Sequence, residues 1–274
     1  MEGAGVRLRR AFGYYDVPEF DPFLMLDDFR SDNPDDYIRG FPWHPHRGIE
    51  TITYILKGEV EHQDSIGNKG VIGAGDVQWK TAGSGIIHQE MPVAKGDGEL
   101  LGFQLWANLP ASRKMMAPRY QEVKSNEIPE LVTDSNCKIR VVCGNYLGVD
   151  GPVKDIITDP VFLDISLPER SEFVFDTPAG HKLFCYVIEG AGYFCKKEVA
   201  GDHSKESFAD NRSIVLFTPG ENLYVHTLES SMRFLFLMGK PLNEPVAWGG
   251  PIVMNTQEEL DLAFEEYENG TFIK

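Results

Sequence analysis

The stretch Phe41-Pro-Trp-His44-Pro-His46-Arg-Gly48 places two histidines two residues apart. A second stretch, Ile86-Ile-His88-Gln-Glu90-Met-Pro92, places a histidine and a glutamate at the same spacing. Side chains two apart on a strand point to the same face of that strand. If both stretches are extended, each supplies a pair of ligands, and the four side chains face one point. The two stretches therefore predict a metal site made by His44, His46, His88 and Glu90.

This ligand set restricts the metal and the kind of site. Three imidazoles and one carboxylate, without a thiolate, suit iron, manganese, nickel or zinc better than calcium or magnesium. They leave open positions on an octahedral ion, which is typical of a catalytic or sensory site. One such pair alone is as often an ordinary surface or core feature. Two pairs roughly forty residues apart favour the metal site.

Short strand-forming segments surround the two stretches, and no helical pattern separates them. The clearest are residues 5–12, 22–29, 50–56, 60–64, 77–80 and 101–107. Pro45 cannot donate a hydrogen bond to a neighbouring strand, so the histidines beside it belong at the start or edge of a strand, as at a cavity rim. This pattern predicts an all-β fold, an antiparallel barrel or jelly roll that keeps its ligand inside.

An internal repeat predicts a second domain of the same kind. Gly48–Gly58 superposes without gaps on Gly180–Gly190, and at the same offset Asp176 and Pro178 replace the His-x-His pair. The proline-rich, polar residues 109–129 are the best linker candidate. We therefore expect two tandem barrels: an N-terminal metal-binding domain over residues 1–120, and a C-terminal domain without metal over residues 121–274.

The chain ends in a predicted helix over residues 257–268. Thr256 and Glu259 form a capping box, and Gly270 suits the position after the helix end. One apolar stripe follows the helix, and it is made by Leu260, Ala263, Phe264 and Tyr267. We interpret this stripe as a packing face of the C-terminal domain.

Composition limits the partners and the location of the protein. A formal charge of −16 at pH 7 argues against direct binding of nucleic acid. No apolar run is long enough for a membrane span or a signal peptide, so we expect a cytoplasmic monomer, or a nuclear one in a eukaryote. The four cysteines, Cys137, Cys143, Cys185 and Cys195, lack Cys-x-x-Cys spacing and are expected to be reduced.

Together these features resemble the pirin family of bicupins. The motifs that carry the resemblance are Asp21-Pro-Phe-Leu-Met-Leu-Asp-Asp-Phe29, Phe41-Pro-x-His44-Pro-His46-Arg-Gly-x-Glu50-Thr, Gly75-Asp-Val-Gln-Trp79-x-Thr-Ala-Gly83, Gly85-Ile-Ile-His88-x-Glu90-Met-Pro92, Gln104-Leu-Trp106-x-Asn-Leu-Pro110 and Gly250-Pro-Ile-Val-Met-Asn-Thr256. The resemblance covers nearly the whole chain. It implies two tandem cupin barrels, a mononuclear Fe(II) in the first, and a second barrel that has lost its metal.

The resemblance places the family's metal ligands on the four residues that the spacing selects. Glu50 is the alternative carboxylate, because in most other cupins the ligand is a glutamate a few residues after His-x-His. Glu50 also shares strand parity with His44 and His46. We favour Glu90 because it lies in the pirin-like His-x-Glu-Met-Pro context.

Pirin-like proteins are associated with two activities. Some resemble quercetin 2,3-dioxygenases, which open a flavonol with molecular oxygen. Others act as iron-dependent transcriptional coregulators that bind protein partners. We favour the enzyme because the predicted site keeps open positions, and we keep the redox-sensing coregulator as the alternative.

The enzyme interpretation assigns further residues. The expected cofactor is Fe(II), with Mn, Ni or Zn as alternatives, and the expected partner is a small aromatic substrate that chelates the metal. Glu90 is the candidate base toward a substrate hydroxyl, and Gln104 is expected to orient a ligand. Apolar walls for a flat substrate are expected from Phe41, Trp43, Trp79, Phe103 and Trp106.

Overall fold

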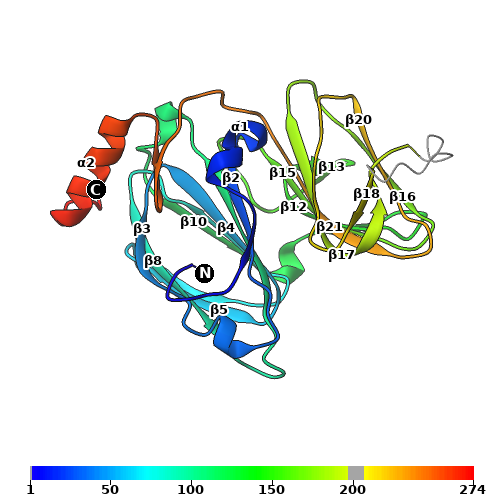
Figure 1. Ribbon diagram of the computed structural model, residues 1–274, viewed down its shortest axis with the longest axis horizontal. Coiled ribbons are helices and arrows are strands. Elements are labelled where there is room, and N and C mark those ends of the chain that lie inside the picture. Colours follow the sequence, from blue (N-terminus) through cyan, green and yellow to red (C-terminus); the bar gives the residue numbers. More distant parts are fainter. Residues whose placement is uncertain (1, 197–206) are drawn as a thin grey trace. The chain divides into compact units, whose positions relative to one another are not determined.

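The structure is a computed structural model that describes residues 2–196 and 207–274. It divides the chain into two compact units, Met1–Ser125 together with Leu242–Lys274, and Asn126–Pro241 (Figure 1). The first unit is therefore discontinuous in the sequence. The sequence predicts that residues 121–274 form the second domain, whereas in the structure the last 33 residues, from Leu242 to Lys274, belong to the first unit.

Two antiparallel sheets form the barrel of the first unit. One sheet has the order β1 (Arg9–Phe12), β2 (Phe23–Asp28), β9 (Leu101–Asn108), β4 (Ile49–Lys57), β7 (Val77–Thr81) and β10 (Arg119–Val123). The other has the order β3 (Phe41–His46), β8 (Ile86–Val93), β5 (Glu59–Asp64) and β6 (Lys69–Ile72). The short helix α1 (Val17–Phe20) precedes β2. The predicted antiparallel all-β fold is confirmed.

The space between the two sheets is partly polar. Thr53 on β4 lies opposite Gln104 on β9, and both side chains reach across to Glu90 on β8. These contacts define which face of β4 and β9 points into the barrel. Because successive residues of a strand alternate between faces, Ile52 and Phe103 point out of it.

The strand β10 lies inside the predicted linker, residues 109–129. Arg119–Val123 pairs with β7 along its whole length. The sequence does not show this strand, because it has no apolar stripe. Instead, Tyr120 and Glu122 contact the buried His62 of β5. The first barrel therefore extends past residue 120.

The second unit is another antiparallel barrel. Its main sheet runs β11 (Glu130–Val132), β12 (Lys138–Cys143), β15 (Val161–Leu167), β21 (Met232–Gly239), β17 (Lys182–Tyr193), β20 (Asn222–His226) and β16 (Glu172–Asp176). The strands β18 (Phe208–Asp210) and β19 (Ile214–Leu216) also pair with β17, and β13 (Asn145–Tyr146) pairs with β14 (Val149–Asp150). The two copies of the sequence repeat fall on β4 and on β17. All four cysteines are free thiols in this unit.

The C-terminal segment contains β22 (Ala247–Gly249), β23 (Ile252–Met254) and α2 (Gln257–Glu268). The predicted helix is confirmed, and its capping box is formed by hydrogen bonds between Thr256 and Glu259 in both directions. Leu260 and Ala263 are buried against β23, whereas Phe264 and Tyr267 are about a third exposed or more.

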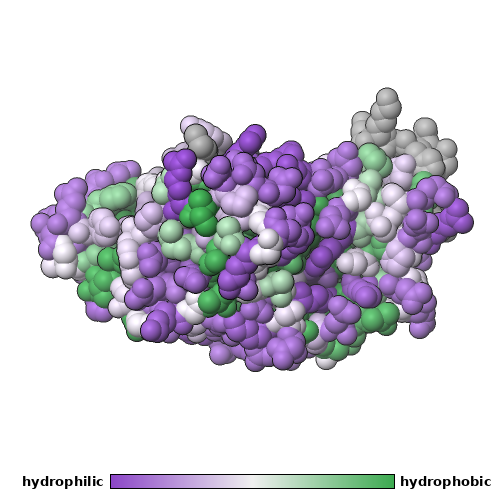
Figure 2. Space-filling model, turned by 90° about the horizontal axis from the view of Figure 1, so that it is seen from below, coloured by the Kyte–Doolittle hydropathy of each residue, from purple (hydrophilic) through white to green (hydrophobic). Residues whose placement is uncertain are grey.

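The described residues include no helix long and apolar enough to cross a membrane. The face drawn in Figure 2 is mostly hydrophilic, and its hydrophobic residues are scattered in small groups.

Candidate metal centre

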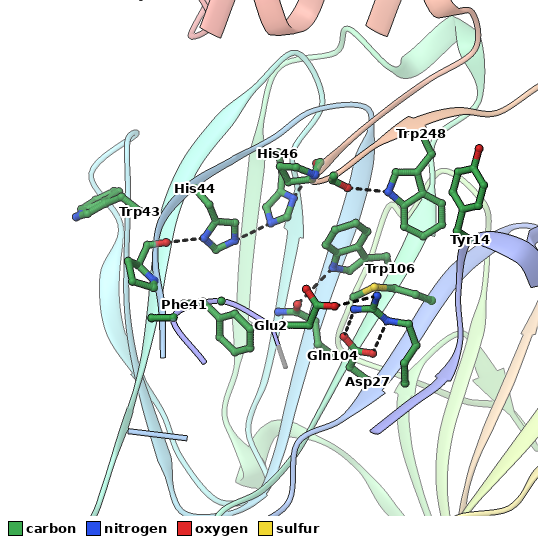
Figure 3. Close-up of a pocket in the computed structure, with 17 residues that line it drawn as sticks. Glu2, Tyr14, Asp27, Phe41, Trp43, His44, His46, Gln104, Trp106 and Trp248 are labelled. Atoms are coloured by element: carbon green, nitrogen blue, oxygen red, sulfur yellow. Dashed lines mark hydrogen bonds and ion pairs between the residues drawn. The ribbon is translucent and has the colours of Figure 1, made fainter. Parts of the chain in front are cut away.

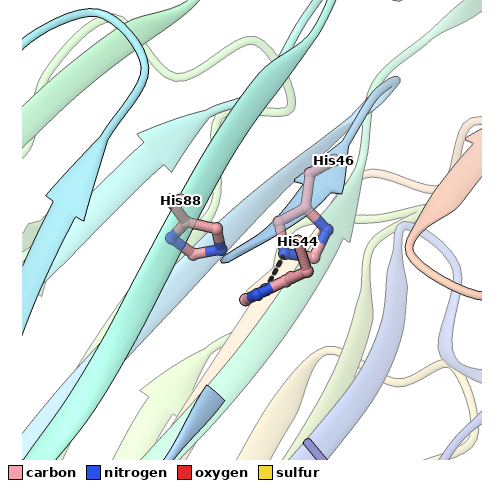
Figure 4. Close-up of side chains that lie close together, drawn as sticks. All are labelled: His44, His46 and His88. Carbon is pink, nitrogen blue, oxygen red and sulfur yellow. Dashed lines mark hydrogen bonds between the residues drawn. The ribbon is translucent and has the colours of Figure 1, made fainter. Parts of the chain in front are cut away.

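Three predicted ligands converge inside the first barrel. The strands β3 and β8 lie side by side with His44 opposite His88, so the period of two brings His44, His46 and His88 together (Figure 4). One ligand atom of each ring lies within 4.8 Å of the other two, and the ring centroids are 4.3–4.9 Å apart. Of the residues described, these three are the group of His, Cys, Asp and Glu side chains that could hold a metal ion.

The hydrogen bonds of two rings fix where their protons lie. Nδ1 of His44 is 2.8 Å from the carbonyl oxygen of Pro42, and Nδ1 of His46 is 3.0 Å from that of Pro251. A carbonyl oxygen only accepts, so each Nδ1 carries the ring proton and donates it. In each neutral ring Nε2 then carries no proton and offers its lone pair.

Those two electron pairs face each other at 3.0 Å between the Nε2 atoms of His44 and His46. Burial lowers the pKa of His44 and lowers the pKa of His46 well below its ordinary value, so both rings stay neutral. Two acceptors this close repel unless a cation lies between them. The arrangement therefore fits a divalent transition metal, which binds neutral imidazole nitrogens.

The third ring lies beside a buried lysine. Nζ of Lys80 on β7 lies 2.7 Å from Nδ1 of His88, and both side chains are buried. A neutral amine accepts a hydrogen bond from Nδ1–H and leaves the lone pair of Nε2 available. An ammonium would donate to Nδ1 and so place the ring proton on Nε2. Burial lowers the pKa of Lys80 and lowers that of His88 well below its ordinary value. The buried Nε2 of His88 has no hydrogen-bond partner within the described part of the chain, as expected of a metal ligand.

Glu90 is buried in the same barrel but is not part of the three-histidine group. Its two carboxylate oxygens accept hydrogen bonds from Oγ1 of Thr53 at 2.9 Å and from Nε2 of Gln104 at 2.8 Å. These bonds hold the carboxylate in one orientation inside the barrel. Its role as fourth ligand stays a prediction.

The rival carboxylate, Glu50, lies on the other face of β4. Glu50 and Thr53 are three residues apart and so point in opposite directions, and Oε1 of Glu50 accepts a hydrogen bond from Thr81 at 2.7 Å. The sequence predicts that Glu50 points to the same face as His46, because the two are an even number of residues apart. This prediction fails because Gly48, with φ +77°, turns the chain between β3 and β4. The structure does not bring Glu50 to the imidazoles.

A pocket of about 650 Å³ opens beside the histidines (Figure 3). It is lined by six residues that the sequence analysis singled out, namely Phe41, Trp43, His44, His46, Gln104 and Trp106. The indole N–H of Trp106 donates to Oε1 of Gln104 at 3.4 Å, so one amide joins the pocket wall to Glu90.

Two residues that were expected to line the pocket, Phe103 and Trp79, do not line it. Phe103 is 1% exposed and points away from the barrel interior. On that outer side, the guanidinium of Arg30 lies 5.6 Å from the centroid of the Phe103 ring. Trp79 is also 1% exposed and lies opposite Ile52, on the same outward side of the sheet. Both follow from strand alternation once Gln104 is known to point inward.

Another part of the pocket wall contains two aromatic residues that the sequence did not predict, Tyr14 and Trp248. Tyr14 and Trp248 lie 5.6 Å apart, and Trp248 lies 5.8 Å from Trp106, all between ring centroids. Beyond them the carboxylate of Asp27 receives two hydrogen bonds from Arg10, each 2.9 Å long (Figure 3). Tyr14 and Trp248 lie near opposite ends of the chain and in none of the motifs that carry the resemblance, whereas Asp27 lies in the motif Asp21–Phe29.

Comparisons with known proteins agree with this architecture. The family model described as Pirin matches residues 5–107, and the Pirin C-terminal cupin domain matches residues 162–273. A "Pirin-like protein" of Caulobacter vibrioides is 43% identical over 99% of this chain and 94% of its own length. A Pseudomonas aeruginosa protein named "Putative quercetin 2,3-dioxygenase" is 42% identical over 98% of this chain and 93% of its own length.

A solved structure extends the similarity. The crystal structure of a quercetin 2,3-dioxygenase from Acinetobacter baumannii superposes with a TM-score of 0.88 at 31% identity, covering 99% of this chain and 93% of that one. The sheets, the converging histidines and the matches over both barrels lead to one conclusion. The chain belongs to the pirin family.

Proposed function

We propose that the protein is a mononuclear iron oxygenase of the quercetin 2,3-dioxygenase type, acting on a flavonol or a similar chelating aromatic substrate. The observation that carries the proposal is an aromatic pocket of about 650 Å³ that has two of the three converging imidazoles in its wall. A pocket of this size suits a flat molecule of a few rings. The names of the relatives from Pseudomonas and Acinetobacter support the same reaction class.

The chain's own residues have separate tasks in this proposal. Trp106 and Trp248 offer their rings to the flat substrate, and aromatic rings favour offset or edge-to-face contacts. Glu90, held by Thr53 and Gln104, accepts the proton of a substrate hydroxyl. When bound, the metal supplies a Lewis acid and a path for electrons between substrate and oxygen.

Anaerobic loading with Fe(II), followed by quercetin and a measured amount of oxygen, tests the proposal. We expect oxygen uptake in proportion to quercetin consumed, with ring-opened product identified by mass spectrometry. His88→Ala is the matched inactive control. A fully loaded site without turnover of quercetin or related chelating phenols would reject the enzyme and favour the iron-dependent coregulator.

A further inference from the structure

The C-terminal segment, residues 247–274, contributes directly to the metal centre. The carbonyl oxygen of Pro251 accepts a hydrogen bond from Nδ1 of His46, with 3.0 Å between the two atoms, although 205 positions separate the two residues. The apolar core of the segment, formed with α2, packs against Ile87, the neighbour of His88 on β8. The segment therefore lies behind two of the three imidazoles.

Arg47, the residue after His46, fastens this segment. Its guanidinium is almost fully buried, and it forms an ion pair of 2.7 Å with Glu266 of α2. The same group donates to the carbonyl oxygen of Phe272 at 2.9 Å and lies 4.3 Å from the centroid of the Phe272 ring. Its Nε donates to the carbonyl oxygen of Ser84 at 2.7 Å, in the turn before β8. One side chain thus joins the segment to both histidine strands.

The backbone beside Arg47 is held as tightly. The amide of Val253 donates to the carbonyl oxygen of Arg47 at 3.1 Å, and Nζ of Lys114 donates to the carbonyl oxygens of Gly48 and Val253 at 2.9 Å each. A Cβ at position 48 would meet the Val253 oxygen at 2.0 Å, so this approach requires glycine. Pro251 consequently has a fixed position relative to His46.

We propose that Arg47 is a positioning residue of the metal centre. By fastening the C-terminal segment, it holds the Pro251 carbonyl against His46, which keeps the ring proton on Nδ1 and Nε2 free for the metal. Hydrogen bonds to the outer nitrogen of a ligating histidine fix both its tautomer and its ring orientation. The inference rests on metal binding by the three histidines and not on the oxygenase reaction.

The test is the affinity of the full-length, metal-free chain for Co²⁺, measured by competition with a chromophoric chelator. Loss of an outer hydrogen bond typically weakens metal binding by about 10–100-fold, and we expect that loss for Arg47→Met. Arg47→Lys keeps a cation and should recover part of the affinity. The visible absorption of bound Co²⁺ should shift in Arg47→Met, because the spectrum reports the geometry of the ligands.

The matched control is Arg30→Met. Arg30 belongs to the same unit, pairs with Asp28 at 2.6 Å and lies over an aromatic ring, so it resembles Arg47 in its contacts but does not touch the C-terminal segment. Its substitution should lower thermal stability without changing Co²⁺ affinity. Equal losses of affinity in Arg30→Met and Arg47→Met would overturn the inference.

A second variant keeps the test decisive if Arg47→Met does not fold. Glu266→Gln removes the ion pair from the segment's side and leaves Arg47 in place, so it should weaken Co²⁺ binding in the same direction. In the double variant the two losses should not add, because both act on one contact. Unchanged affinity in folded Arg47→Met, or in Glu266→Gln, would overturn the proposal. A native chain that binds no Co²⁺ would reject the metal centre itself.

Discussion

The two barrels repeat one strand arrangement but differ in what faces their interiors. In the first, Thr53 on β4 lies opposite Gln104 on β9, and both hold Glu90. The sequence repeat aligns Thr53 with Cys185 on β17, and Cys185 lies opposite Phe236 on β21. A polar pair that orients a carboxylate is thus replaced by an apolar pair.

The replacement continues through the second core. The rings of Phe173, Phe175, Phe234 and Phe236 pack together with centroid separations of 4.5–6.5 Å. Such a core gains stability from buried area and aromatic contacts. Buried polar groups cost free energy unless each has a partner, and the first barrel supplies partners for most of its own. The difference shows that the side chains at a few inward-facing positions decide whether the interior of this fold holds a polar site or an apolar core.

The largest expected effect comes from removing a ligand. His88→Ala should abolish tight metal binding, because the site then keeps two imidazoles, and Glu90→Ala should lower metal occupancy to a smaller extent. Elemental analysis of protein prepared under reducing conditions measures both. His226→Ala, which removes a buried histidine from the second barrel, serves as the control. Normal metal content in His88→Ala would contradict the three-histidine site.

The next effect concerns the polar pair that distinguishes the barrels. Gln104→Leu imitates the apolar second barrel and leaves one oxygen of Glu90 without its donor. We expect metal affinity to fall by about tenfold, the lower end of the range for lost outer contacts. Competition with a chelator measures the metal affinity. Gln104→Glu is the variant of similar size, because it keeps the length of the side chain but also lacks the amide donor. If Gln104→Leu binds metal normally, Glu90 does not depend on this bond.

A smaller effect is expected at the pocket wall. Trp248→Ala removes one ring from the aromatic wall and should weaken quercetin binding by about 0.5–1.5 kcal/mol, the usual value of an aromatic contact. Binding to zinc-loaded protein, followed by fluorescence quenching, measures affinity without turnover. Tyr15→Ala is the control, because Tyr15 is 93% exposed and does not line the pocket. Equal affinities of the two variants would remove Trp248 from the substrate site.

Glu50→Gln should change the pH dependence of stability and leave metal loading near normal. Burial raises the pKa of Glu50 above its ordinary value of 4.5, so the folded chain retains a proton that the unfolded chain has released. The stability that Glu50 contributes is full below the ordinary pKa and declines as the pH rises through the folded pKa. Urea titrations from about pH 4.5 to about pH 7.5 should therefore increasingly favour the variant. Parallel curves for the two chains would show that the pKa of Glu50 is not raised.

We expect no change in the number of metal ions per chain when the His-x-His pair of the first barrel is introduced into the second. Asp176→His combined with Pro178→His puts a His-x-His pair at the repeated position of the second barrel. Both positions are exposed, and the neighbouring interior is filled by phenylalanines, so the new imidazoles lack a third ligand. Elemental analysis should still find one metal ion per chain. Two ions per chain would show that the pair alone suffices.

Features set by local periodicity could be predicted from the sequence. The period of two put His44 and His46 on one face of their strand, and the capping box marked the start of α2. The absence of helical patterns between short strands gave the fold class. Each of these depends on neighbours within a few positions.

The rest depends on contacts between distant segments. Tyr14 and Trp248 meet at the pocket although they lie near opposite ends of the chain, and no local pattern joins them. Phe103 was assigned to the wrong face because the inward face of β9 is set by the bond from Gln104 to Glu90. The C-terminal segment was given to the domain nearest in sequence, whereas its packing partners lie in the first barrel.

The discontinuity of the first unit has a consequence for biosynthesis. A ribosome releases the histidine strands early, but His46 gains the Pro251 carbonyl only after another 205 residues have been added. At the usual 5–20 residues per second, this takes about 10–40 s. During that interval His46 of a nascent chain lacks this partner. We therefore expect the site to reach its full metal affinity only after translation has ended, and a chain that terminates before Pro251 to bind metal more weakly.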